Sequence, residues 1–597
     1  MLIELVKHKF FAVAIIASSD ILYNLPKLLV KGFVMGGFWL KFSDRRSAIA
    51  SLGVGIAIAI CSAFANIFAN PTAAHSAEQI RFWYAPFGEF TIYISDLEKF
   101  AKEGKLSKRL EFYLEKLSPP QQAQFREALT KRYSISHIMA AQFSYAPIGE
   151  ILIRRLGRIL EMAPDLNGFS ALRASLILSA QSEEGVSILN LLQRYPAPVI
   201  YLDLARGLEA YAEVSQLLYK REFAIAAIEK HAIAETQNNQ NKALLAPQKD
   251  LRIAGDVKWT KEQFTYWQRD RNVKISADIY LPQGLASPAP LIVISHGLAS
   301  NPDTWQYLSQ HLASHGFAVA ALEHPHTGSR DFTAFLSGLS KAPQSEEAVQ
   351  RPYDVKYLLD ALAEKVKTDP LWRDRINPEQ VGLIGHSLGG YTVFTLGGAQ
   401  LNFKKINQEC SIFEPNVSSF NIAKILQCRF SSLDTNNINL SDRRVKAVLA
   451  LNPLGGSTLL GKEGMQTIKI PIAIFASGDD FFTPAIPEQF FPFVWLTSPN
   501  KYLVTFPKGT HFSFLERSDR GVLVVPESIL GEKPEFTHPY AKALSLAFFQ
   551  THLHNRPEFG AYLNHAYVQA IANSRFPASL TTDFSEAQLL QALEDAP

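Results

Sequence analysis

The stretch Val381-Gly-Leu-Ile-Gly-His-Ser-Leu-Gly-Gly390 limits how this chain can fold. Its first part, residues 381–384, is an apolar run typical of a buried strand, and residues 391–396 have the composition of a helix. Between them, residues 385–389 fit the pattern G-x-S-x-G. A sharp turn from strand to helix gives its central residue a positive φ, and flanking glycines leave room for it. We therefore predict that Ser387 stands clear at the tip of such a turn.

A serine at this place is expected to act as a nucleophile. The N-terminus of the following helix favours negative charge, which is the charge that develops when a hydroxyl attacks an ester carbonyl. The alternative is a Gly/Ser turn without chemistry. The strand before Ser387 and the helix after it favour the nucleophile.

Apolar runs on both sides of this stretch alternate with helical patterns. Continuous apolar strands of this kind are typical of a mostly parallel sheet that is covered by helices on both faces. In such sheets the sites lie at the carboxyl ends of the strands, and Ser387, Asp480 and His511 each follow such an end. The predicted strands are residues 274–281, 291–295, 317–322, 381–384, 445–451, 470–476 and 502–506.

The other two members of a catalytic triad are expected later in the chain. A serine hydroxyl needs a base to take its proton, and the base needs an orienting carboxylate. In α/β-hydrolases the chain order is Ser, then Asp or Glu, then His, and His511 follows the last predicted strand. Two carboxylates, Asp479 and Asp480, end the strand before it, and neighbours in an extended segment point in opposite directions. Asp480 is the preferred acid, and Asp479 is expected to be a solvated or capping residue.

Two backbone N–H groups are needed to stabilise the oxyanion. One is expected from Leu388, directly after the nucleophile, and the other from Leu298, in the loop after the strand of residues 291–295. His296 is expected to pack the turn rather than to act as a second base.

At these residues the sequence resembles a known family. Ile294-Ser-His-Gly-Leu298 and Gly385-His-Ser-Leu-Gly-Gly390 are similar to the plasma-type platelet-activating-factor acetylhydrolases, and more loosely to the dienelactone hydrolases. The likeness covers about residues 250–550 and implies an α/β-hydrolase fold and a metal-free esterase without a cofactor. It also implies Ser387 as nucleophile, His511 as base, and Leu298 and Leu388 as oxyanion donors. One departure concerns the acid, because the acetylhydrolase position is occupied here by Asn452, which cannot serve as a carboxylate.

The 597 residues divide by pattern into several parts. A mostly helical domain is predicted over 78–235, opened by a hairpin of residues 80–84 and 90–94 around Pro86 and Gly88. A polar linker, 236–250, leads to the α/β-hydrolase domain, 251–555, and a helical tail is expected over 556–597. Residues 401–444 interrupt the hydrolase pattern, either as a cap over the site or as a surface insertion. The layout also resembles cyanobacterial hydrolases that carry an N-terminal domain of unknown function.

The first 76 residues have the order of a targeting segment. Basic residues precede an uncharged run, 48–69, and the small residues Ala74-His-Ser76 follow it, as in a secretory signal. Because the run is just long enough to span a bilayer, an uncleaved anchor is the alternative, and translation from Met35 would give a signal of ordinary length. The protein is therefore expected to be exported to the periplasm, envelope or medium, or anchored by residues 48–69.

Three cysteines occur, and two of them, Cys410 and Cys428, lie in the insertion. In an exported protein they could form a disulfide, whereas two buried free thiols are the alternative. The aromatic residues after the acid, Phe481, Phe482, Phe490, Phe491, Phe493 and Trp495, are expected mostly in the core.

These observations predict a serine esterase or lipase with an ester or lipid substrate. Seven of the Lys and Arg residues lie in positions 1–76 against three acids there, so the rest of the chain is close to neutral and gives no case for nucleic acid. Association with a membrane or lipid surface is a further expectation, whereas the sequence makes no prediction of oligomeric state. The alternatives are a peptidase or polyester hydrolase on the same scaffold, and a binding protein that keeps the fold without turnover.

Overall fold

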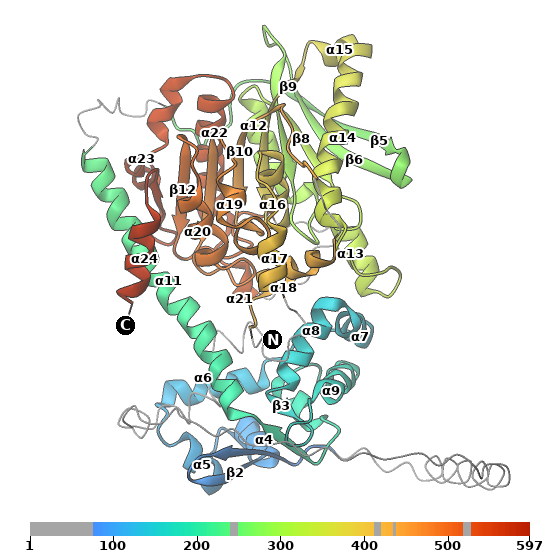
Figure 1. The fold of residues 1–597 in the computed structure, drawn as a ribbon, viewed down its shortest axis with the longest axis vertical. Coiled ribbons are helices and arrows are strands. Elements are labelled where there is room, and N and C mark those ends of the chain that lie inside the picture. The colour runs from blue at the N-terminus through green and yellow to red at the C-terminus, as the bar shows by residue number, and fades with distance from the viewer. Residues whose placement is uncertain (1–75, 239–248, 411–418, 434–437, 517–526, 597) are drawn as a thin grey trace, which may run out of the picture. The chain divides into compact units, whose positions relative to one another are not determined.

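The computed structural model describes residues 76–238, 249–410, 419–433, 438–516 and 527–596 (Figure 1). The predicted targeting segment, with its apolar run and Met35, lies outside these residues except for Ser76. Among the described residues, no helix is both long and apolar enough to cross a membrane.

The chain forms two compact units. The N-terminal unit contains residues 76–140 and 153–211, and the C-terminal unit contains residues 141–152 and the chain from 212 onward. The division falls within α11 (Leu204–Asn238), the longest helix of the described residues, and the larger part of this helix, from residue 212, belongs to the C-terminal unit.

The N-terminal unit combines short helices with a four-stranded sheet of order β2-β1-β4-β3. The predicted hairpin is present as β1 (Gln79–Tyr84) and β2 (Gly88–Tyr93). The other strands are β3 (Leu160–Glu161) and β4 (Val199–Leu202). Its helices include α4 (Ile94–Glu103), α5 (Lys108–Leu114), α6 (Pro119–Thr130), α9 (Phe169–Gln181) and α10 (Ile188–Gln193).

The C-terminal unit is built on a nine-stranded sheet of order β13-β12-β11-β10-β9-β7-β8-β6-β5. The six strands from β12 to β8 are parallel, whereas β5, β6 and β13 join the sheet antiparallel. The expected mostly parallel sheet is therefore confirmed. The strands are β5 (Trp259–Gln268), β6 (Val273–Pro282), β7 (Ala289–Ser295), β8 (Ala318–Glu323), β9 (Ile376–His386), β10 (Val445–Leu451), β11 (Ile472–Ser477), β12 (Lys501–Phe506) and β13 (Ser579–Thr581).

Both faces of this sheet are buried, which explains the continuous apolar strands. Alternate residues of β7 point to opposite sides, so Leu291 and Val293 join one core and Ile292 and Ile294 the other. The first core includes α14 (Glu347–Thr368) and α16 (Leu388–Leu396), and the second includes α12 (Gln306–Ser314) and α22 (Pro534–His552) (Figure 1).

Residues 556–597 differ in one respect from the expected helical tail. They contain α23 (His565–Ala570) and α24 (Glu586–Glu594), but between these helices β13 pairs antiparallel with β12. The tail therefore supplies an edge strand of the large sheet, and its Leu580 is buried in the core.

Candidate active site

Ser387 occupies a tight turn between β9 and α16. Its backbone has φ 56° and ψ −118°, a conformation that is rare for a residue with a side chain. Glycine is required on both sides, because a Cβ at Gly385 would lie 2.2 Å from the carbonyl oxygen of Gly389, and one at Gly389 would lie 2.0 Å from that of Ser295. Ser387 is only half-buried whereas its neighbours are buried. The turn therefore presents its hydroxyl at the carboxyl edge of the sheet.

The expected base and acid, His511 and Asp480, form a buried pair. His511 Nδ1 lies 2.7 Å from Asp480 Oδ2, and since a carboxylate only accepts, His511 Nδ1 is the donor and Nε2 is left as the acceptor. The other carboxylate oxygen accepts the N–H groups of Phe482 and Thr483, both at 2.8 Å. The hydroxyl of Thr483 adds a bond of 2.7 Å to Asp480 Oδ2. This set of donors holds the carboxylate in one orientation toward the imidazole.

Two side chains hold the His511 loop against the serine turn. His386, the residue before Ser387, donates from Nε2 to the carbonyl oxygen of His511 at 2.8 Å. Burial holds the pKa of His386 well below its usual range, so this ring is neutral. Asn452, at the end of the neighbouring strand β10, donates from Nδ2 to the carbonyl oxygen of Thr510 at 3.0 Å. Asn452 thus supports the loop of the base at the position where the acetylhydrolases carry their acid.

The expected oxyanion donors flank the same turn. Leu388 is the first residue of α16, and the loop of Leu298 packs so closely that a Cβ at Gly297 would lie 3.1 Å from Ser387 Cβ. Within the described ranges, neither the N–H of Leu298 nor that of Leu388 donates to another group of the protein. Both amides are therefore available to a substrate oxygen.

A buried arginine that the sequence analysis missed supports this loop. Arg351 of α14 is fully buried and donates to the carbonyl oxygen of His296 and, at 2.6 Å, to Thr327 Oγ1. His296 itself is buried, donates from Nδ1 to Gly297 and accepts the N–H of His324, and burial lowers its pKa to about 3. It therefore packs the turn, as expected, and is not a second base. One signal in the sequence could have indicated this support, because a charged arginine interrupts the apolar pattern of residues 345–367.

Asp479 turns away from His511 and pairs with a second residue that the sequence analysis missed. Arg221 of α11 lies 3.0 Å from Asp479 Oδ1 and donates to the carbonyl oxygen of Gly478 at 2.7 Å. The side chain of Arg221 is only 14% exposed. The N–H of Asp479 donates in turn to Gly509 at 2.7 Å, which ties the loop of the acid to the loop of the base. Asp479 is thus partly solvated, as expected, with 42% of its side chain exposed, but it is also held in an ion pair.

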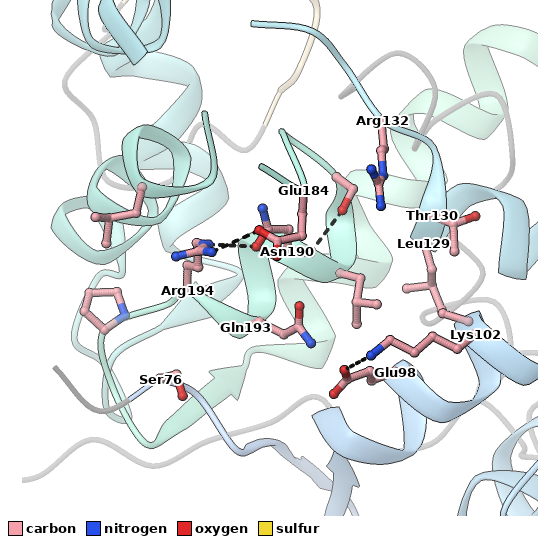
Figure 2. Close-up of a pocket in the computed structure, with 15 residues that line it drawn as sticks. Ser76, Glu98, Lys102, Leu129, Thr130, Arg132, Glu184, Asn190, Gln193 and Arg194 are labelled. Carbon is pink, nitrogen blue, oxygen red and sulfur yellow. Dashed lines mark hydrogen bonds and ion pairs between the residues drawn. The ribbon is translucent and has the colours of Figure 1, made fainter. Parts of the chain in front are cut away.

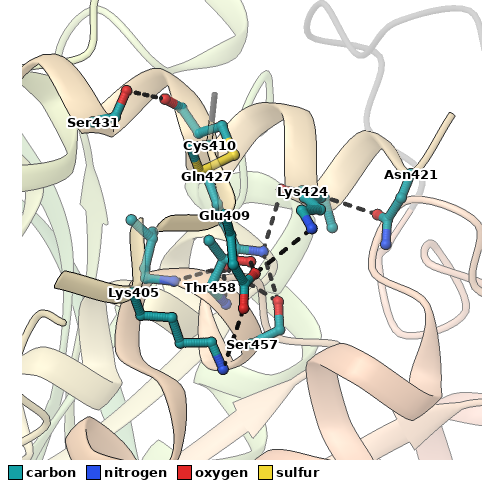
Figure 3. The surroundings of a disulfide bond; sticks show 12 residues. Lys405, Glu409, Cys410, Asn421, Lys424, Gln427, Ser431, Ser457 and Thr458 are labelled. Carbon is teal, nitrogen blue, oxygen red and sulfur yellow. Dashed lines mark hydrogen bonds and ion pairs between the residues drawn. A yellow bond between two sulfur atoms is a disulfide. The ribbon is translucent and has the colours of Figure 1, made fainter. Parts of the chain in front are cut away.

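The insertion contains two short helices, α17 (Phe403–Glu409) and α18 (Ile422–Cys428), joined by a disulfide between Cys410 and Cys428 (Figure 3). Gln427 accepts the N–H groups of Thr458 and Leu459 and donates to the buried carboxylate of Glu488 at 2.8 Å. Residues 411–418 and 434–437 of the insertion lie outside the described residues. The disulfide therefore ties the two helices of the insertion to each other, and Gln427 fixes the insertion to residues 458–459, which follow β10.

The aromatic residues after the acid divide between core and site. Phe490 and Phe493 are buried in the core, as expected for most of the group. Phe482 differs, because it is half-buried and its ring centroid lies 5.2 Å from that of His511. Phe482 is therefore a wall of the site.

At two other places that could hold a ligand or an ion, several charged groups already pair with their neighbours. A cavity of about 560 Å³ in the N-terminal unit is lined by charged side chains, but Lys102 pairs with Glu98 and Arg194 with Glu184 (Figure 2). In the C-terminal unit, His231, Glu235 and Asp583 have metal-ligand atoms within 4.8 Å of one another. Those atoms already bond to one another or to Gln588, Thr581 and Thr582. We therefore assign no metal or cofactor to either place.

Comparisons with known proteins agree with this fold. Residues 76–203 match a family model described as an alpha/beta hydrolase of unknown function, and residues 290–404 match the model of the alpha/beta hydrolase fold. A platelet-activating factor acetylhydrolase from Cavia porcellus is 26% identical over 151 residues, which cover 20% of this chain and 35% of that protein. The chain thus spans about a third of the length of this relative. Strand order, serine turn and family matches together show that the C-terminal unit has the α/β-hydrolase fold.

Proposed function

We propose that the protein is a serine hydrolase of carboxylic esters, an esterase or lipase in which Ser387, His511 and Asp480 form the triad. The observation that carries the proposal is the buried bond of 2.7 Å between His511 Nδ1 and Asp480 Oδ2, in a loop held by His386 against the serine turn. An imidazole that donates from Nδ1 to the carboxylate keeps Nε2 directed away from it as a proton acceptor, which a base for a serine hydroxyl requires.

The reaction then has two halves. Ser387 Oγ attacks the ester carbonyl carbon as its proton passes to His511 Nε2, and Asp480 stabilises the imidazolium that forms. The N–H groups of Leu298 and Leu388 stabilise the oxyanion. His511 then gives its proton to the leaving alcohol, and the same base activates a water that releases the acid from the acyl-enzyme.

The substrate class is an ester of lipid or lipid-like type. It is supported by the similarity to an acetylhydrolase and by the aromatic wall that Phe482 forms beside His511. Export, or anchoring by residues 48–69, belongs to the same proposal and is supported by the order of basic, apolar and small residues in positions 1–76.

A substrate panel tests this proposal. We expect the purified protein to hydrolyse p-nitrophenyl esters, with a preference among acyl chain lengths, and to leave peptide substrates intact. Cleavage of peptides or of polyester films with little ester turnover would assign the same triad to those rival reactions. Failure of a fluorophosphonate probe to label Ser387 would indicate a binding protein without turnover.

Removing Arg221 is expected to lower kcat without unfolding the protein. In Arg221→Ala the loop of Asp479 and Asp480 loses two bonds, and a small displacement of a catalytic group lowers kcat by about tenfold. KM should change little, because Arg221 holds the acid loop and not the substrate. A double-mutant cycle with Asp479→Asn should give a coupling of about 0.5–1 kcal/mol in urea unfolding, since Asp479 is partly solvated. An unchanged kcat in Arg221→Ala would contradict this role.

A further inference from the structure

The end of the β1–β2 hairpin carries large aromatic side chains that are exposed to solvent. Trp83 is 66% exposed and Phe87 is 56% exposed, and the neighbouring Phe112 of α5 is 63% exposed. We call Phe82–Phe90 together with Phe112 the aromatic finger. Each of these side chains would be stabilised by leaving water, because burial of apolar surface is favourable. Exposed apolar patches of this kind commonly mark interaction sites.

The finger extends beyond its own sheet. β1 pairs with β4 only over Gln79–Arg81, so within the described residues Phe82–Tyr84 pair with β2 alone. A two-stranded ribbon is only marginally stable by itself. Here it is braced by α5, which lies beside β2 in Figure 1. The ring of Phe90 stacks on Phe112 at 6.4 Å, and that of Phe82 lies 6.3 Å from Tyr113. The aromatic end is therefore a built feature and not a loose loop.

Both faces of the ribbon are aromatic at this end. Tyr84 stacks on Phe87 at 5.7 Å on one face, and Trp83 leaves the opposite face because successive strand residues alternate. The turn from Tyr84 to Gly88 has no charged residue. The ion pair between Arg81 and Glu89, 3.7 Å apart, lies on the face of Trp83 and limits the apolar part to the tip. A flat protein partner would cover one face, whereas a bilayer surrounds both.

The chain before the hairpin also indicates that a bilayer covers this aromatic end. The uncharged run of residues 48–69, the candidate anchor, ends ten residues before Gln79. At about 3.3–3.6 Å per residue, β1 begins within about 35 Å of the end of this run. Trp and Tyr, which the finger carries as Trp83 and Tyr84, are also the residues that favour the boundary between headgroups and acyl chains.

We infer that the aromatic finger inserts into the interfacial layer of a lipid bilayer and docks the N-terminal unit there. α5 carries Lys108 and Arg109 but also Glu111, so the attraction is apolar rather than electrostatic. Docking is therefore expected on neutral phosphatidylcholine and at high salt. The inference does not depend on hydrolysis, so its failure and the failure of the proposed function can be told apart.

Quenching of tryptophan emission by brominated phosphatidylcholine tests the insertion. The full-length chain is reconstituted in vesicles with and without bromine on the acyl chains, and the wild type is compared with Trp83→Phe. Because Trp83 is one of seven tryptophans, quenching of Trp83 by bromine should remove up to about a seventh of the total tryptophan emission. That part of the loss should be absent in Trp83→Phe and should remain in Trp267→Phe, the matched control, whose exposed tryptophan (55%) lies in the C-terminal unit.

A second variant separates insertion from other causes. Phe87→Ser, which leaves the contacts between α5 and the ribbon in place, should reduce the quenching of Trp83 while the circular dichroism spectrum stays unchanged. Equal bromine quenching in wild type and Trp83→Phe would overturn the inference. So would self-association of the wild type in sedimentation that Phe87→Ser abolishes, because the occupant of the patch would then be a second copy of the chain.

Discussion

Ser387→Ala is expected to lower kcat for p-nitrophenyl esters by at least about 10⁴-fold. Loss of the nucleophile removes the acyl-enzyme route and leaves only what binding and the oxyanion donors supply. The fold should persist, because Ser387 is half-buried, its side chain fills no core position, and alanine occupies less space. Initial rates at saturating substrate, together with labelling by a fluorophosphonate probe, measure the effect.

The matched control is Ser337→Ala, which changes an exposed serine of the same unit. This variant should keep wild-type turnover and probe labelling. Substantial activity in Ser387→Ala, with labelling at a different serine, would remove the basis of the proposed mechanism.

Asp480→Asn is expected to lower kcat by about 10³–10⁴-fold. Asparagine has the same shape but carries no negative charge, so it holds the His511 Nδ1 proton less strongly. The imidazole can then take the wrong tautomer. The bonds from Phe482, Thr483 and the Thr483 hydroxyl indicate that the site is built for a carboxylate. The measurement is kcat across pH 5–9, with KM expected to change little.

The neighbouring substitution, Asp479→Asn, is the control because the two residues are adjacent and chemically equal. Asp479 faces Arg221 and not His511, so its loss should cost about tenfold or less in kcat. If Asp479→Asn had the larger effect, the acid would be assigned to the wrong residue.

The large sheet was predicted well where its strands are apolar. All seven expected strands occur as β6 to β12, because burial on both faces leaves continuous apolar runs in the sequence. The two outermost strands were missed. β5 has exposed polar residues in its centre, and β13 is three residues long, so neither carries that signal.

The supports of the site could not be predicted from local pattern. Arg221 lies 257 positions from Gly478 in the sequence, and Arg351 lies 55 from His296. Asn452 could be recognised as unable to act as the acid, but its bond to Thr510 could not be foreseen. Each of these contacts depends on which loops the sheet brings together.

The sequence by itself determined the serine turn, the parallel sheet and the order of serine, acid and histidine. These follow from glycines, apolar runs and short spacings, whose effects act over a few residues. Only the tertiary structure decided that His511 bonds to Asp480 and not to Asp479, and that Arg221, Arg351 and Asn452 hold the surrounding loops. The physical reason is that a hydrogen bond requires its two atoms within about 3 Å, and for residues far apart in sequence only the packed sheet fixes that distance.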